Sequence, residues 1–321
     1  MHSFEELAIA FKNKFEVKHF PSEPQSLYES CDYFLSIGGK RIRPVMCLMG
    51  NELFDEINPD TWHVAAAIEL FHNFTLMHDD IMDAAPLRRG MQTVHTKYGN
   101  NTALLGGDVM LVVAYDYLNK ISNTYLHKVI TLFNRTAREV CEGQQMDMDF
   151  EKQQAVGLDA YIKMIELKTS VLLAASLQLG AILGGASEGN RQHIYEFGKN
   201  LGIAFQVQDD YLDAFGDPEK FGKDIGGDIR QNKKTFLLIH ALEAASDEQR
   251  NDLLQLMKEN PTDKVERVLE IFKACNVDDW AWQLKQQYLD KAIEHLDAIA
   301  VVSSRKKSLL ELANFLIQRE H

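Results

Sequence analysis

The stretch between Pro86 and Pro218 contains no proline, and this feature constrains the fold more than any other. Proline removes a backbone donor and clashes with the preceding turn of a helix, so long proline-free segments with helically spaced apolar residues favour α-helices. No segment shows the sustained alternation of a half-buried strand, and we therefore predict no strand. Hydrophobic residues make up 45% of the 321 residues, enough for one large core. The predicted fold class is all-α.

Apolar residues recur at helical spacing along most of the chain, and capping residues mark several helix starts. The predicted helices cover residues 3–16, 25–37, 41–54, 60–84, 91–97, 102–121, 124–150, 159–184, 190–216, 231–245, 247–258, 262–275, 278–300 and 304–319. Two loops stand out between them. One is the glycine-containing basic segment at residues 37–44, and the other is the glycine-rich charged segment at residues 216–234.

Charge and cysteine content limit the partners and the location of the chain. The net charge is −13, which argues against a nucleic-acid-binding surface. The four cysteines form no CxxC pair, which favours a reducing compartment. The first residues include Glu5 and Glu6 and lead into no long apolar run, so we expect no signal peptide. No stretch reaches the ~18 apolar residues of a membrane span. We predict a cytoplasmic protein without a stable membrane span or a nucleic-acid partner.

Two acidic motifs of the form DDxxD, at Asp79–Asp83 and Asp209–Asp213, each follow a long apolar segment. Residues four apart lie on one face of a helix, roughly 6 Å apart, so the outer aspartates of each motif point the same way. A hard cation offsets the repulsion between such carboxylates, and oxygen-only ligation favours Mg²⁺. The alternative is a solvated acidic helix end. The occurrence of two motifs, each near basic residues, disfavours that alternative.

Basic residues stand where a metal-bound diphosphate needs them. Arg88 and Arg89 follow the first motif, and guanidinium groups bind phosphate through two parallel hydrogen bonds. The other basic candidates are Lys40, Arg41, Arg43, Lys168, Lys223 and Lys233. The segment GGKRIRP lacks both the spacing of a nucleotide-binding phosphate loop and a preceding strand, so it is a weak nucleotide-binding signal.

Five motifs follow one another between roughly residues 25 and 240: GGKRIRP, HDDIMD with RRG, the pair Lys168-Thr169, GIAFQVQDDYLD and GKDIGGDIRQNK. With these motifs in this order, the chain resembles the trans-isoprenyl diphosphate synthases of the farnesyl and geranylgeranyl type, in the polyprenyl synthetase family. The resemblance implies one isoprenoid synthase domain over residues 1–321, with helices around a central active-site cavity and the two aspartate motifs facing each other. It also implies a homodimer. The implied activity is a Mg²⁺-dependent head-to-tail condensation of isopentenyl diphosphate with allylic diphosphates.

The resemblance implies metal-binding roles for the aspartates. Asp79 and Asp83 would hold Mg²⁺ on one side of the allylic diphosphate, and Asp209 would hold Mg²⁺ from the second motif. Three Mg²⁺ ions are implied when the allylic diphosphate is bound. The aspartates that would support these ligands are Asp80, Asp210 and Asp213.

The resemblance also implies two separate pockets for the two substrates. The residues that would grip the allylic diphosphate are Arg88, Lys168 and Lys223. The residues of the metal-free pocket for isopentenyl diphosphate would be Lys40, Arg43, His72, Arg89 and Phe205, with Lys233 near the same phosphate region. Thr169 and Gln206 would direct oxygen dipoles at the allylic cation, and the released pyrophosphate would accept the proton. Closure of residues 216–234 would exclude water.

Residues before the first motif set the product length in this family. Phe74 stands five positions before Asp79, Thr75 four before and Phe71 eight before, so the two aromatic rings share a helical face. Two adjacent aromatic residues before the motif are typical of a C15 synthase. A single aromatic at the fifth position with a small residue at the fourth is more similar to a C20 synthase. We therefore predict geranylgeranyl diphosphate as the product, with farnesyl diphosphate as the alternative.

Three other protein classes share parts of this pattern. A class I terpene cyclase normally carries an Asn/Ser/Glu triad in place of the second motif, and this chain has an intact DDYLD. A squalene-type synthase carries acidic motifs of another pattern. A non-catalytic subunit of a heteromeric synthase generally loses one aspartate motif or the basic loop, and here all are complete.

Overall fold

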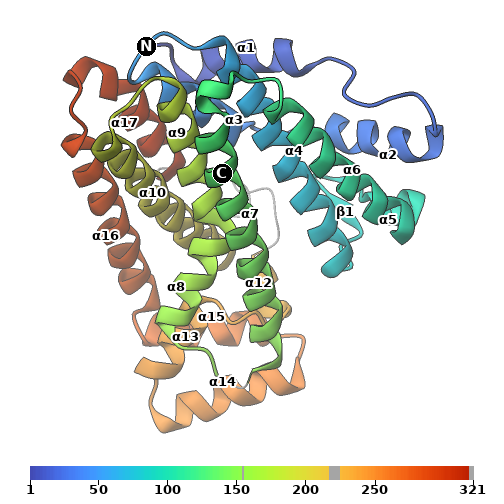
Figure 1. The fold of residues 1–321 in the computed structure, drawn as a ribbon. Helices are drawn as coiled ribbons and strands as arrows, with labels where there is room; N and C mark the ends of the chain where they lie inside the picture. The colour runs from blue at the N-terminus through green and yellow to red at the C-terminus, as the bar shows by residue number, and fades with distance from the viewer. Residues whose placement is uncertain (154, 217–224, 318–321) are drawn as a thin grey trace. The chain divides into compact units, whose positions relative to one another are not determined.

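The computed structural model describes residues 1–153, 155–216 and 225–317, and these residues are almost entirely helical, which confirms the predicted fold class (Figure 1). The elements of the first part of the chain are α1 (Phe4–Phe15), α2 (Gln25–Ser36), α3 (Ile42–Glu52), α4 (Pro59–Met82), β1 (Leu87–Arg88), β2 (Met91–Gln92), α5 (Val94–Tyr98), α6 (Asn100–Leu118) and α7 (Asn123–Lys152). The elements that follow are α8 (Leu158–Ile165), the π-helical turn η1 (Glu166–Ser170), α9 (Val171–Leu183), α10 (Glu188–Phe215), α12 (Gly227–Arg230), α13 (Phe236–Ala244), α14 (Asp247–Glu259), α15 (Lys264–Ala274), α16 (Val277–Ala298) and α17 (Ser303–Ile317).

The prediction of no strand was wrong at one place, a two-stranded antiparallel hairpin after the first aspartate motif. Leu87 pairs with Gln92 and Arg88 pairs with Met91. The two turn residues between them, Arg89 and Gly90, both have positive φ angles, as tight two-residue hairpin loops require. Strands of two residues are too short to produce a visible alternation in the sequence. The helix expected from residue 91 consequently begins at Val94.

The helix predicted over residues 231–245 also begins later than expected. Residues 227–230 form the short helix α12, and α13 begins only at Phe236. Asn232 has a φ of 59°, which is incompatible with a continuous right-handed helix. Thr235 is extended and stands as the residue before α13.

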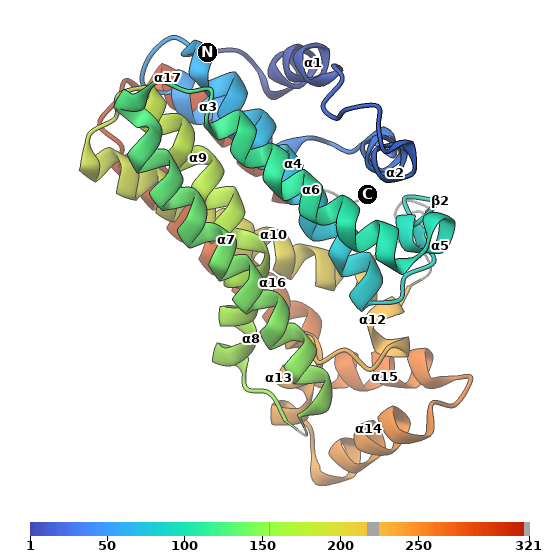
Figure 2. The same ribbon diagram turned by 45° about the vertical axis from the view of Figure 1, so that its right-hand side comes forward.

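The chain divides into two compact units. The first unit comprises Met1–Phe133, Ser176–Arg191 and Val301–Ser308. In it α4 packs along α6, and α3 packs on α4 (Figure 2). Asn58 caps α4 by accepting a hydrogen bond from the Asp60 amide, and Pro59 occupies the first turn, where it needs no donor. This packing places the first aspartate motif at the carboxyl end of α4.

The second unit comprises Asn134–Ala175, Gln192–Ala300 and the residues from Leu309 on. Its core joins α8 and α10 to the carboxyl-terminal helices, and α13, α14 and α15 pack on one another (Figure 1). Fully or nearly fully buried side chains of this core include Val207, Phe236 and Phe272. The second aspartate motif lies in the last turns of α10.

One helical run departs from the expectation that no segment reaches the length of a membrane span. Among the described residues, Leu158–Leu183 is long and apolar enough by length and composition, and 83% of its most apolar window is buried inside the protein. Such burial is typical of a core helix, because a membrane span exposes its apolar side chains to lipid.

Candidate functional site

Four arginines of the first unit, here called the arginine cluster, surround the ring of His72 on α4: Arg41, Arg43, Arg88 and Arg89. Burial lowers the pKa of His72 well below its usual value, and the positive charges of Arg43 and Arg89 lower it further. The ring is therefore neutral. Its Nε2 lies 3.1 Å from Nη1 of Arg43 and accepts a hydrogen bond, because a guanidinium group can only donate.

The members of the arginine cluster differ in what they bond. Arg88 donates to both carboxyl oxygens of the buried Asp80, with Nε 2.9 Å from Oδ2 and Nη2 2.8 Å from Oδ1. Arg41 forms an ion pair with Glu69. Arg43 bonds to a neutral ring, and Arg89 bonds to the backbone carbonyl of Gly38. These last two arginines thus keep a positive charge that a bound anion can neutralise.

Arg43 carries a further sign of a missing ligand. Its side chain is partly buried, and burial lowers its pKa to about 10. Among the described residues, its buried Nε has no hydrogen-bond partner. A buried N–H group without a hydrogen-bond acceptor lowers the stability of the fold. A phosphate oxygen would accept a hydrogen bond from this N–H group of Arg43. Lys40, the residue before Arg41, is exposed on the loop before α3.

The first aspartate motif presents its outer members to solvent. The Asp83 amide donates to the Asp79 carbonyl at 2.8 Å, so the helical turn continues to Asp83 and keeps both side chains on one face. Asp79 is half-buried and Asp83 is exposed, whereas Asp80 is buried with Arg88. The middle aspartate therefore bonds to Arg88 within the protein, whereas Asp83 faces solvent.

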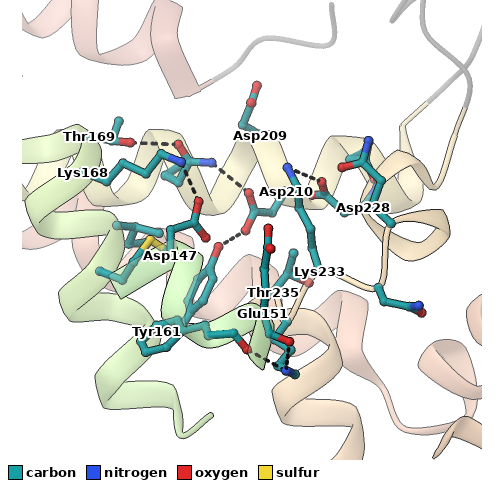
Figure 3. A pocket seen from close by; sticks show the side chains of 18 residues that line it. Asp147, Glu151, Tyr161, Lys168, Thr169, Asp209, Asp210, Asp228, Lys233 and Thr235 are labelled. Carbon is teal, nitrogen blue, oxygen red and sulfur yellow. Dashed lines mark hydrogen bonds and ion pairs between the residues drawn. The ribbon is translucent and has the colours of Figure 1, made fainter. Parts of the chain in front are cut away.

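The second motif lines a cavity of about 480 Å³ within the second unit, here called the aspartate cavity (Figure 3). Its acidic lining residues are Asp147, Glu151, Asp209, Asp210, Asp213 and Asp228. Its basic lining residues are Lys168, Lys233 and Lys234. Of the residues predicted from the sequence, it brings together Lys168, Thr169, Gln206, Asp209, Asp210, Asp213 and Lys233.

Asp210 is the buried member of this second motif. Its carboxyl oxygens accept hydrogen bonds from the Tyr161 hydroxyl and, at 2.9 Å, from the Gln206 amide. Burial raises the pKa of Asp210 to about 8, and the negative charge of Asp228 contributes to the rise. Like Asp80, it is held by protein groups, while its neighbour Asp209 is exposed (Figure 3).

Lysines partly neutralise the other aspartates of the cavity. Nζ of Lys168 lies 2.5 Å from a carboxyl oxygen of Asp147, and Nζ of Lys233 lies 3.4 Å from one of Asp228. The Asp228 amide donates to Asp213 at 2.9 Å. Figure 3 shows these two lysine pairs on either side of Asp210.

The π-helical turn η1 carries Lys168 and Thr169, within what the sequence predicted as one continuous helix. Such turns are rare and occur frequently at functional sites. Two glycines let neighbouring helices approach it. A Cβ on Gly143 of α7 would lie 2.2 Å from the Lys168 amide nitrogen, and one on Gly202 of α10 would lie 2.8 Å from the Ser170 Cα. The Thr169 hydroxyl reaches Oε1 of Gln206 at 3.4 Å.

Sequence reasoning missed several residues of the aspartate cavity, among them Asp147, Tyr161 and Asp228. Asp228 lies inside the recognised GKDIGGDIRQNK segment and could have been included. Gly143, isolated in a long helix, signalled a close backbone approach near Asp147. Tyr161 carried no local signal. The predicted Lys223 lies outside the described residues, and Phe205 is half-buried on α10 beside Gln206.

The residues of the aspartate cavity suit a divalent cation that a substrate helps to bind. Among the described residues, no group of three His, Cys, Asp or Glu side chains is arranged to hold a metal ion alone. Mg²⁺ usually takes one or two carboxylates and completes its shell with water and phosphate oxygens. Burial and then the negative charge of Asp228 raise the pKa of Asp210, and a cation would offset that charge. The donor set therefore fits Mg²⁺ together with a diphosphate.

Comparison with known proteins agrees with this chemistry. A family model described as "Polyprenyl synthetase" matches residues 24–275. The geranylgeranyl diphosphate synthase of Saccharolobus solfataricus is 38% identical over 314 residues, which cover 95% of this chain and 94% of that protein. A geranylfarnesyl diphosphate synthase of Natronomonas pharaonis is 32% identical, covering 93% and 92%. The crystal structure of a geranylgeranyl pyrophosphate synthase has a TM-score of 0.94 and 41% identity, covering all of both chains.

Asp210 makes the stability of the metal-free protein depend on pH. The pKa of Asp210 is higher in the folded chain than in the unfolded one, so the folded state binds the proton more tightly and loses stability as the pH rises towards about 8. The slope is at most about 1.4 kcal/mol per pH unit for one group. In EDTA, we expect a lower melting temperature at pH 8 than at pH 6, and a weaker dependence in Asp210→Asn. Replacement of the exposed Asp159 by Asn is the control, and equal slopes in all three proteins would contradict the assignment.

Proposed function

This chain belongs to the polyprenyl synthetase family, and we propose that it condenses isopentenyl diphosphate with an allylic diphosphate head to tail, with geranylgeranyl diphosphate as the product. This is a prenyl transfer of the EC 2.5.1 class. The observation that carries the proposal is the contrast between the arginine cluster and the aspartate cavity. The arginine cluster can bind an anion directly. The aspartate cavity is rich in carboxylates and can bind an anion only when divalent metal ions lie between them. Two diphosphates, one of them metal-bound, match these two requirements.

We assign the allylic diphosphate to the metal-dependent aspartates. Asp79, Asp83 and Asp209 are the proposed ligands of Mg²⁺, and the exposure of Asp83 and Asp209 supports this role. Bound Mg²⁺ supplies Lewis-acid charge that stabilises the pyrophosphate leaving group. Lys168 adds a fixed positive charge once the diphosphate competes with Asp147 for its ammonium group. Arg88 and Lys223 are the remaining proposed contacts. Asp80, Asp210 and Asp213 keep supporting roles.

We assign isopentenyl diphosphate to the arginine cluster. Arg43 and Arg89 bond only to neutral groups in the interactions described above, and the neutral His72 can pass one hydrogen bond on to a phosphate. Lys40 adds an exposed cation. Phe205 is the proposed cover for the apolar chain, and Lys233 remains a proposed phosphate contact.

Thr169 and Gln206 are the proposed groups that face the allylic cation. Their oxygens lie 3.4 Å apart in the aspartate cavity, where the negative ends of both dipoles can stabilise a positive carbon. The amide of Gln206 also donates to Asp210, which fixes the orientation of its oxygen. The π-helical turn directs Thr169 to this point, so the geometry depends on the backbone rather than on one rotamer.

The experiment that tests the function supplies the purified protein with isopentenyl diphosphate, Mg²⁺ and, separately, dimethylallyl, geranyl or farnesyl diphosphate. We expect mass spectrometry to find a C20 product from farnesyl diphosphate, and none in EDTA. Asp209→Asn should lower kcat by ~100-fold or more, because it removes charge that acts on the leaving group. The control Asp159→Asn should retain full activity. If folded wild-type protein forms no product with any starter, the alternatives are a cyclase or a non-catalytic subunit.

The proposed C20 product rests on a group of aromatic rings in the first unit. The ring centroids of Phe71 and Phe74 are 5.6 Å apart, and Phe133 of α7 lies 5.3 Å from Phe71. Phe71 is only 1% exposed, so the group is anchored in the core. Thr75 is small and bonds to the His72 carbonyl at 2.8 Å. We propose these rings as the floor against which the growing chain stops. Farnesyl diphosphate remains the alternative product.

Removing one ring of this floor should lengthen the product. Phe74→Ala leaves space beside Phe71, into which a longer isoprenoid tail can extend. With farnesyl diphosphate as the starter, we expect products longer than C20, measured by chromatography after dephosphorylation. An unchanged C20 product from a folded variant would exclude Phe74 from the floor.

We propose that the protein acts as a homodimer through one face of α6. Leu104, Leu105, Val112 and Tyr115 fall within about 100° of the helix circumference, and their exposed fractions are 46%, 57%, 61% and 36%. The exposed Asp108 falls within the same arc and interrupts the apolar face. Exposed apolar patches bordered by polar residues are typical of an interface. A second copy is the occupant that the family resemblance implies.

The dimer prediction is tested by placing a charge in this face. Val112→Lys should convert a dimeric wild-type protein to a monomer in sedimentation velocity, because a buried unpaired ammonium group opposes association. Leu254→Lys is the matched control, since Leu254 is 52% exposed on α14. A monomeric wild-type protein, or dissociation by both variants, would contradict the assigned face.

We retain residues 1–321 as one isoprenoid synthase domain, and the family match over residues 24–275 supports this proposal. A cytoplasmic location is also proposed. The four cysteines are free thiols, which fits a reducing compartment.

A further inference from the structure

His78, the residue before the first aspartate motif, packs between α4 and α6. Its ring lies 4.8 Å from that of Phe74, one turn earlier on α4, and meets it edge-on at 68°. On its other side, Nε2 lies 3.1 Å from the carbonyl oxygen of Leu104 on α6. Phe74 therefore has Phe71 on one side and an imidazole fixed by a backbone carbonyl on the other.

Gly107 of α6 provides the space for this imidazole. A Cβ at position 107 would lie 2.2 Å from Nε2 of His78 and 2.5 Å from its Cδ2. No side chain fits at that distance unless the imidazole moves. The neighbouring Gly106 differs, because a Cβ there would lie 3.3 Å or more from flexible side-chain atoms. The position of His78 is thus set by the absence of a side chain at Gly107.

We propose that His78 and Gly107 are positioning residues for product length, which act by fixing the ring of Phe74. The proposal rests on the function inferred above, in which Phe74 belongs to the floor under an apolar isoprenoid tail. Phe71 is buried and cannot shift readily, so of the two rings described in contact with Phe74 the half-buried His78 is the one that can move. The contact with the His78 imidazole therefore determines whether the ring of Phe74 can rotate away from the isoprenoid tail.

The two residues should have opposite effects when they are changed. A methyl group at position 107 pushes the imidazole away from α6 and towards Phe74, which narrows the space for the tail. Removal of the imidazole at position 78 lets Phe74 turn away, which opens that space. A general loss of stability cannot produce shifts in opposite directions, so the direction identifies the mechanism.

The experiment measures the ratio of C15, C20 and C25 products for Gly107→Ala and His78→Ala, with dimethylallyl diphosphate as the starter and circular dichroism as the folding control. We expect Gly107→Ala to raise the C15 share relative to C20 by about tenfold, the discrimination that one methyl group gives in an apolar pocket. His78→Ala should raise the C25 share by a similar factor. The double variant should match His78→Ala, since the added methyl group then meets no ring. Gly106→Ala is the matched control and should keep the wild-type ratio.

The outcomes separate this inference from the function on which it rests. A wild-type protein that forms no product with any starter overturns both. A C20-forming wild type whose ratio is unchanged in both variants, or shifts the same way in both, overturns the inference and leaves the function intact. An equal shift in Gly106→Ala also overturns it. If Gly107→Ala does not fold, His78→Ala alone decides.

Discussion

Repulsion between closely spaced carboxylates is the constraint on which the organisation of this protein depends. In each aspartate motif, this repulsion is reduced because the middle carboxylate is held apart from the other two. The middle residues, Asp80 and Asp210, are buried and held by protein donors, the first by the guanidinium of Arg88 and the second by the neutral side chains of Tyr161 and Gln206. Of the outer residues, Asp83 and Asp209 are exposed, and Asp79 and Asp213 are half-buried. The three aspartates of each motif are therefore not equivalent, because the middle one is buried and bonded within the protein.

The difference between the two buried aspartates follows from their partners. A bidentate guanidinium supplies a full opposite charge, whereas a hydroxyl and an amide supply only dipoles. Burial raises the pKa of Asp210 to about 8 and the charge of Asp228 adds to the rise, which the hydrogen bonds from Tyr161 and Gln206 offset only in part. A cation bound in the aspartate cavity would offset negative charge that the neutral partners of Asp210 do not.

Much of this arrangement could be predicted from the sequence, because it depends on local spacing. The helical class followed from the proline-free stretch, and the paired carboxylates followed from the four-residue interval within each motif. The hairpin that carries Arg88 could not be predicted, since two-residue strands leave no periodic signal. The same holds for Asp147 and Tyr161, which reach the aspartate cavity from helices distant in sequence. The π-helical turn η1 could not be predicted from helical spacing either, because its residues are also found in ordinary α-helices.

The π-helical turn has a consequence for how this chain can change by insertion or deletion. A π turn holds one residue more than an α turn, so loss of one residue within Glu166–Ser170 would give a more regular helix. The same deletion would rotate every side chain from Val171 onwards by about 100° about the helix axis relative to those before it. Side chains buried on α9, Leu172 and Leu173 among them, would leave their places in the core. The length of this helix is therefore constrained, because a single-codon deletion in the turn would misalign either the core or Lys168 and Thr169.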